Sequence, residues 1–171
     1  TLLHKSDVGA VQLGLANAKA VEAAWKRIQS NLKKHNVKDK PDGMLVAKQV
    51  KGGLELVLGI NRDPETGPVV MVGTGGVWLE LIKDVAFAAP PISREKAMDM
   101  LAQTHAGTLL NGYRGGPIYD VEAVIIAIMS LGRLAEDFGT LIHSVDVNPF
   151  LVMPAGQGAV ALDALVIFEK K

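Results

Sequence analysis

The sequence has no cysteine, no excess of charge of either sign and no long hydrophobic run. Its 18 Lys and Arg balance its 18 Asp and Glu, so no global positive field gathers nucleic acid or an anionic membrane. Without cysteine, disulfides, iron–sulfur clusters and thiolate zinc sites are excluded. No apolar stretch reaches the ~18 residues of a membrane helix, and no signal peptide is recognisable. These features predict a cytoplasmic protein without nucleic-acid or membrane partners.

What the 171 residues do contain is typical of a globular protein. Hydrophobic residues make up 49% and charged residues 21%, with 18 Gly and 8 Pro, which argues against a disordered chain or a coiled coil. No repeat and no linker long enough to divide the chain is evident, so we expect one domain over residues 1–171. Because the chain opens on Thr1 and not on Met, we expect a shortened or processed chain.

Three helices are predicted from apolar spacing and capping residues. The first follows Asn17 and carries one apolar face, formed by Val21, Trp25, Ile28 and Leu32. The second begins at Ser93 and runs to about Thr104. The third follows Asp120 and keeps an apolar face up to Gly139.

Strands are predicted between turn signals. Leu54–Asn61 and Pro68–Val72 flank a hairpin loop at residues 63–67, and a further strand is expected at Val77–Lys83. Leu141–Met153 and Ala159–Phe168 flank a compact turn at residues 154–158. The sequence therefore predicts an α+β fold, mainly antiparallel sheet packed with helices.

The last hairpin offers candidate metal ligands. Asp146 and Asn148 lie two apart and so share one face, and the turn brings Asn148 opposite Asp163 and Ala164. Carboxylate and amide oxygens of this kind suit Mg²⁺ together with substrate phosphates. The alternative is that these are polar residues at strand ends, and spacing alone leaves both interpretations open.

A glycine cluster at residues 73–76 is a second candidate site. Glycines let backbone N–H groups turn toward a phosphate without a side chain in the way, which gives Gly75 and Gly76 a potential role in binding. An ordinary hairpin loop or bulge explains the same residues.

Near the start, His4, Lys5 and Ser6 place an imidazole, an ammonium and a hydroxyl side by side. Lysine neutralises phosphate charge, and histidine can accept or relay a group near neutral pH. The alternative is a solvated polar loop. The other histidines, at 35, 105 and 143, have no spacing typical of a metal site.

Glu55 and Arg62 bracket one predicted strand. They are seven residues apart, so a regular pleat points them at opposite faces, and only a bulge would let both contact one ligand. Glu55 stands in an otherwise apolar strand, where a buried carboxylate needs a partner. A metal or nucleotide role for Glu55 is therefore credible.

Taken together, these segments resemble one family over nearly the whole chain: the ATP-grasp domain of ADP-forming acyl-CoA synthetases, which is similar to that of the succinyl-CoA synthetase β subunit. The resemblance rests on the order of several short motifs. They are His4-Lys5-Ser6-Asp7-Val8-Gly9, Gly53-Leu54-Glu55, Arg62-Asp63-Pro64, Gly67-Pro68, Gly75-Gly76, Lys83-Asp84-Val85, Asp146-Val147-Asn148-Pro149 and Leu162-Asp163-Ala164.

The resemblance implies Mg²⁺-dependent phosphoryl transfer between ATP or ADP and a phosphohistidine, coupled to acyl-CoA formation or cleavage. CoA and the carboxylic acid would bind a partner domain or subunit that carries the phosphohistidine, and an oligomer is implied. In this chain His4 and Glu55 would be catalytic, and Asn148 and Asp163 would hold Mg²⁺. Nucleotide or phosphate contacts would come from Lys5, Ser6, Val46, Gln49, Arg62, Gly75 and Gly76.

Three departures from the family pattern stand out. Ala10 occupies the place of a usual glycine, and Ala88 that of a common arginine. The family's preceding strand, with a nucleotide-binding lysine, has no counterpart, so the resemblance implies an ATP-grasp domain incomplete at its N-terminus. An alternative is a non-catalytic ATP-grasp module of a multidomain acyltransferase. His4, Asn148 and Asp163 favour the enzyme, whereas Ala88 favours the module.

Overall fold

A computed structural model describes residues 8–37, 41–76 and 84–169. The chain forms two compact units, residues 1–51 and residues 52–171. The expectation of one domain over residues 1–171 stays a prediction. The strand expected at Val77–Lys83 lies outside the described residues.

The first unit contains one long helix, α1 (Ala18–Lys34). As predicted, Asn17 caps it: the side-chain oxygen accepts a hydrogen bond from the Ala20 N–H at 2.9 Å. Ala24 and Ile28 are buried on the predicted apolar face. The helix ends where Asn36 adopts a left-handed conformation with φ 52°, because asparagine tolerates that region better than most residues.

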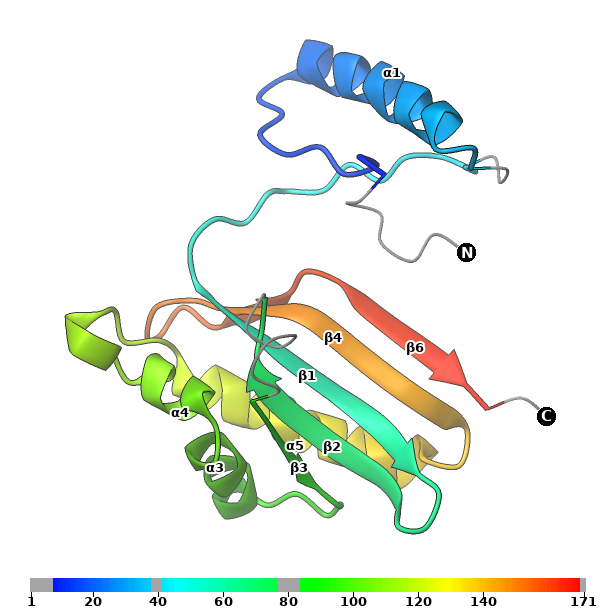
Figure 1. Cartoon of the computed structure of the whole chain (residues 1–171). Helices are drawn as coiled ribbons and strands as arrows, with labels where there is room; N and C mark the ends of the chain where they lie inside the picture. The colour runs from blue at the N-terminus through cyan, green and yellow to red at the C-terminus, as the bar shows by residue number, and fades with distance from the viewer. Residues whose placement is uncertain (1–7, 38–40, 77–83, 170–171) are drawn as a thin grey trace. The chain divides into compact units, whose positions relative to one another are not determined.

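The described residues of the second unit form a six-stranded antiparallel sheet, most of whose strands are labelled side by side in Figure 1. The order is β3-β2-β1-β4-β5, with β6 also paired to β4. The strands are β1 (Leu54–Asp63), β2 (Gly67–Thr74), β3 (Val85–Ala88), β4 (Ile142–Val152), β5 (Ala159–Ala161) and β6 (Ala164–Phe168). Both predicted hairpins are confirmed, but the strand expected over Ala159–Phe168 is interrupted at Leu162 and Asp163.

Helices cover one face of this sheet (Figure 1). They are α3 (Arg94–Ala102), α4 (His105–Leu110) and α5 (Val121–Phe138), with a short 3₁₀ turn, η1, at Tyr113–Gly115. The caps predicted at Ser93 and Asp120 are present. None of the described helices is long and apolar enough to cross a membrane.

The helix predicted to run from Ser93 to Thr104 is shorter than expected. It ends at Ala102, and α4 begins three residues later. Thr104 causes the break, because its backbone is extended and its buried hydroxyl donates to the Leu101 carbonyl at 3.0 Å. Threonine readily makes such local bonds, which compete with helix continuation.

The core lies between the sheet and the helices. On β1 the alternate residues Leu56, Leu58 and Ile60 are buried in it, as period-2 alternation requires. Val70 and Val72 of β2 and Ile128 of α5 complete its centre. Glu55, which lies between the core-facing Leu54 and Leu56, therefore belongs to the face opposite the helices.

Burial of Leu58 predicts a large effect of truncation. Leu58 is 1% exposed at the centre of the sheet, so Leu58→Ala should lower the free energy of unfolding by about 2–5 kcal/mol, measured by urea denaturation. The matched control is Leu165→Ala on β6, where the leucine is 59% exposed and the change should be within about 0.5 kcal/mol. Equal effects of the two changes would contradict the assigned core.

Asp120 joins the start of α5 to the turn between β4 and β5. Its carboxylate accepts from the N–H groups of Gly158 at 2.8 Å and Ala123 at 3.1 Å. These bonds, the one from Gly158 first, lower the pKa of Asp120 below its ordinary value of 3.8. The ionised carboxylate thus stabilises the folded state.

A pH dependence follows from this lowered pKa. The contribution of Asp120 is fully present above pH ~4 and is lost as the pH falls through the folded-state pKa. Asp120→Ala should therefore lower Tm clearly at pH 7, and the loss should shrink progressively as the pH falls below ~4. Asp99→Ala, at an exposed position on α3, is the control that should change little at either pH. A constant loss of Tm across this range would contradict the assignment.

Candidate functional site

Glu55 lies beside the glycine pair predicted to bind phosphate. The Gly75 N–H donates to the Glu55 carbonyl at 3.0 Å, so the chain leaving β2 turns over the start of β1. A methyl group added to Gly75 would lie 2.9 Å from the Glu55 backbone, and one added to Gly76 would lie 3.3 Å from Glu55 Oε2. Gly76 also has φ +65°, which favours glycine. The structure therefore joins three predicted site residues.

The next strand, β4, carries a bulge at Asn148. Leu56 of β1 pairs with Phe150, but Leu58 pairs with Val147, so Val57 faces two residues, Asn148 and Pro149. An extra residue of this kind bends the strand and redirects its side chains. Asn148 thus lies opposite Val57, which is two residues after Glu55 on β1.

Asp163 lies beside Asn148, on the side of β4 that faces away from β1. Val147 pairs with Ala164, and the Leu162 N–H donates to the Pro149 carbonyl at 3.0 Å. Asp163 lies between these two contacts, in the link from β5 to β6, and its Oδ1 accepts from the Ala164 N–H at 3.1 Å. Asn148 thus lies level with Asp163, within the region that the hairpin turn predicted, while Ala164 pairs with Val147.

Asp146 is electrostatically coupled to Asp163. It lies between the core-facing Val145 and Val147, on the same face of the sheet as Glu55. Desolvation raises the pKa of Asp146, and the negative charge of Asp163 raises it further. Two carboxylates that disfavour each other's charge would gain from a cation between or beside them. The sequence pattern indicated Asp146 as a candidate Mg²⁺ ligand beside Asn148, whereas the family resemblance gave that role to Asn148 and Asp163.

The donor set fits a magnesium–nucleotide site better than a cage made of protein ligands alone. Among the described residues no group of three or more His, Cys, Asp or Glu side chains is placed to hold a metal ion. An amide and a carboxylate are nevertheless what Mg²⁺ uses where phosphate oxygens and water fill the remaining positions. Asn148 and Asp163 supply these two groups.

Arg62 lies at the opposite end of β1 from Glu55. Seven residues at ~3.3 Å each separate the two by about 23 Å, and β1 pairs with β2 without any register shift that would bring them together. The Arg62 guanidinium donates to the Gly139 carbonyl beyond α5, and its Nε is 3.7 Å from Glu169. The bulge in this part of the sheet lies on β4, and it does not bring Glu55 and Arg62 to one ligand.

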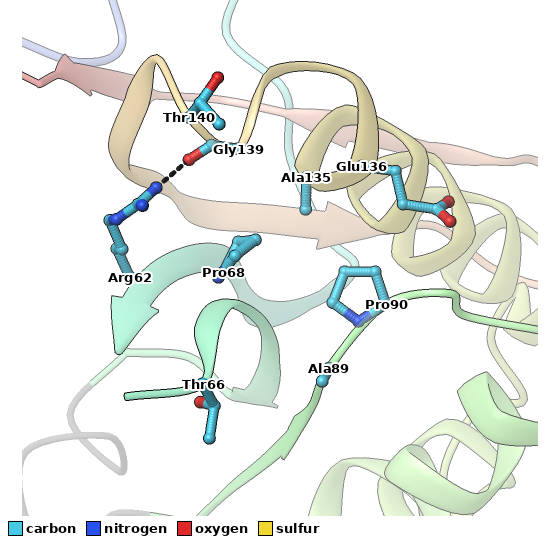
Figure 2. A pocket seen from close by; sticks show the side chains of 9 residues that line it. All are labelled: Arg62, Thr66, Pro68, Ala89, Pro90, Ala135, Glu136, Gly139 and Thr140. Carbon is cyan, nitrogen blue, oxygen red and sulfur yellow. Dashed lines mark hydrogen bonds between the residues drawn. The ribbon is translucent and has the colours of Figure 1, made fainter. Parts of the chain in front are cut away.

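Figure 2 shows the surroundings of Arg62. A pocket of about 320 Å³ lies between the β1–β2 hairpin, the end of β3 and the C-terminal end of α5. Arg62, Pro68, Pro90 and Glu136 are among the residues that line it. Since Arg62 already bonds Gly139 and pairs with Glu169, its guanidinium anchors the end of α5 to the sheet.

The remaining candidates belong to the first unit or lie outside the described residues. Gln49 accepts a hydrogen bond from the Gly14 N–H at 2.8 Å, and Val46 is 64% exposed. Both stay predictions as nucleotide contacts. His4, Lys5 and Ser6 fall outside the described part of the chain. Their motif ends at Gly9, whose carbonyl accepts from the Asn31 side chain of α1 at 3.0 Å.

Comparison with known proteins identifies the fold. A family model described as an ATP-grasp domain matches residues 1–168, and this match extends across both compact units. A crystal structure from Pyrococcus horikoshii superposes with a TM-score of 0.90 at 33% identity, covering 99% of this chain and 72% of that one. The α+β, ATP-grasp prediction is therefore confirmed.

Curated relatives narrow the family. The chain is 33% identical to the acetate–CoA ligase [ADP-forming] II subunit beta of Pyrococcus furiosus, over 98% of this chain and 71% of the relative. It is 40% identical to the 4-hydroxybutyrate–CoA ligase [ADP-forming] of Nitrosopumilus maritimus, over 96% of this chain. That relative is much longer, and the chain spans only 24% of its length.

A solved acetyl-coenzyme A synthetase 1 from Candidatus Korarchaeum cryptofilum also matches. Its structure in complex with coenzyme A and Mg-AMPPCP has a TM-score of 0.84 at 35% identity and covers 99% of this chain. The chain covers 72% of that protein. With the family model, the β-subunit relative and the shared architecture all in agreement, this chain belongs to the ATP-grasp family, in the group found in ADP-forming acyl-CoA ligases.

Proposed function

We propose that this chain is the nucleotide-binding part of an ADP-forming acid–CoA ligase. It would move a phosphoryl group between ATP or ADP and a histidine, coupled to acyl-CoA formation or cleavage. One observation carries the proposal: Glu55, the Gly75–Gly76 turn, Asn148 and Asp163 come from four separate segments and gather at one end of the sheet.

The arrangement suits phosphoryl transfer on electrostatic grounds. In such reactions the protein contributes positioning and charge stabilisation more than covalent chemistry. The Gly75–Gly76 turn would let the phosphoryl group approach the backbone closely, with Glu55 as a polar group beside it. When bound, Mg²⁺ would neutralise charge on the phosphates, and Asn148 and Asp163 would hold it.

Support for the nucleotide and the metal comes from the Korarchaeum protein. One of its structures contains coenzyme A and Mg-AMPPCP, with a phosphohistidine segment pointing towards the nucleotide-binding site. By analogy, a partner domain or subunit would bring its phosphohistidine to this chain. His4 would then act as a second carrier, Lys5 and Ser6 would contact phosphate, and Val46 and Gln49 would lie near the adenine.

Recognition of the carboxylic acid substrate and assembly into an oligomer would depend on parts of the protein outside residues 1–171. Relatives that share this segment are named for acetate, for 4-hydroxybutyrate and for trans-feruloyl-CoA. This spread supports the proposal that acid recognition lies outside residues 1–171. An oligomeric assembly and a cytoplasmic location stay predictions.

Phosphohistidine formation tests the proposed reaction. Incubating the full-length protein with γ-labelled ATP and Mg²⁺ should give acid-labile, base-stable label on histidine. Asp163→Asn should reduce the rate of labelling by about tenfold or more, because the metal loses a charged ligand. His143→Ala is the control: this histidine pairs with Glu169 at the Arg62 end and should leave labelling unchanged.

The same experiment separates the enzyme from a non-catalytic ATP-grasp module. A protein that binds Mg-ATP normally but never becomes labelled would be the module, and the proposed reaction would then be wrong. Labelling that is as fast in Asp163→Asn as in the wild-type protein would remove Asp163 from the site.

Gly75→Ala tests the glycine turn. The new methyl group would meet the Glu55 backbone at 2.9 Å, so the turn must shift. Displacement of a group that contacts the phosphoryl path should slow labelling by about tenfold to a hundredfold. Gly156→Ala, in the β4–β5 turn, is a control for added bulk, because nothing lies within 4 Å of its methyl position. Because Gly156 has φ +77°, which favours glycine, this control should lower stability but leave the rate of labelling unchanged.

A further inference from the structure

Asp84 belongs to one of the recognised motifs, Lys83-Asp84-Val85, and has not been assigned a role. Its side chain is only 9% exposed, although a carboxylate buried without partners would be costly. The groups that donate hydrogen bonds to this carboxylate therefore indicate its role. They come from the end of β2 and from the start of α4.

The first partner is Thr74, the residue directly before the Gly75–Gly76 turn. The Thr74 hydroxyl donates to Asp84 Oδ2 at 3.2 Å, and the Thr74 N–H donates to the Asp84 carbonyl at 3.3 Å. Thr74 is itself 4% exposed. The turn is thus fixed on one side by Asp84, through Thr74, and on the other by the bond from Gly75 to Glu55.

The second partner is His105, the first residue of α4. Its backbone N–H donates to both carboxylate oxygens of Asp84, at 3.1 and 2.9 Å, and its Nδ1 lies 3.0 Å from Oδ1. The cap residue of α4, Thr104, makes no side-chain capping bond of its own. Asp84 therefore takes over the capping of α4 from a distant part of the chain.

We infer that Asp84 is a positioning residue, which holds the Gly75–Gly76 turn in register with Glu55 by binding Thr74 while anchored to α4. This role rests on the proposed function, because it matters for phosphoryl transfer only if the turn lines the phosphoryl path. Fixing such a turn in advance avoids the loss in rate that a small misplacement of a catalytic contact causes.

Thr74 offers a matched pair of variants. Thr74→Val keeps the shape and removes the hydroxyl, whereas Thr74→Ser keeps the hydroxyl and removes a methyl group. Hydrogen exchange at the Gly75 amide, followed by mass spectrometry in the full-length protein, should be about tenfold faster in Thr74→Val. Exchange should be close to wild type in Thr74→Ser and in His105→Ala, which leaves the Thr74–Asp84 bond and the backbone cap intact.

Phosphohistidine labelling provides the second readout. Its rate at saturating Mg-ATP should fall about tenfold in Thr74→Val and in Asp84→Asn. The double variant should be no slower than Asp84→Asn alone, because that change already removes the carboxylate oxygen to which the Thr74 hydroxyl donates. Thr74→Ser should restore the wild-type rate, which a general loss of packing would not allow.

Each outcome decides something. Unchanged Gly75 exchange in Thr74→Val, equal damage in Thr74→Ser, or losses that simply add would overturn the role of Asp84. If the exchange pattern holds but the wild-type protein forms no phosphohistidine, the proposed reaction is wrong while Asp84 still positions the turn. If the wild type is labelled and Thr74→Val is labelled equally fast, the positioning role in transfer is wrong.

Discussion

The candidate site depends on how β1 pairs with its two neighbours. On one side β1 pairs with β2 without interruption, which brings the end of β2 and its glycine turn beside Glu55. On the other side it pairs with β4 through a bulge, which places Asn148 and Pro149 against Val57. Because the core-facing side of β1 is packed by Leu56, Leu58 and Ile60, a slip in register would expose these side chains. Core packing thus fixes the polar groups on the opposite face.

The two ends of the sheet carry different polar groups with different tasks. Nearer the Glu55 end, burial and then the charge of Asp163 raise the pKa of Asp146, which pairs with Gly59 in the middle of β1. At the other end, Arg62 is committed to Gly139 and Glu169, which tie α5 and the end of the chain to the sheet. Like charges placed close together favour a bound cation.

Sequence reasoning succeeded where the physical cause is local. The caps at Asn17, Ser93 and Asp120 follow from side chains that bond the backbone three residues ahead. The facing of Asn148 and Asp163 follows from one short turn. It did not anticipate the partners of Arg62 and Asp84, because these are remote: Gly139 is 77 residues from Arg62 and His105 is 21 residues from Asp84. Such contacts depend on how whole helices pack, which no short motif encodes.

We propose that Asn148 and Asp163 together hold the divalent cation of a bound nucleotide. The most direct measurement is a crystal structure of the full-length protein with ADP and Mn²⁺, located by its anomalous scattering. We expect one Mn²⁺ peak at about 2.0–2.3 Å from a side-chain oxygen of each residue and from nucleotide phosphate oxygens. A cation bound to the phosphates, with both side chains well beyond ligand distance, would contradict it.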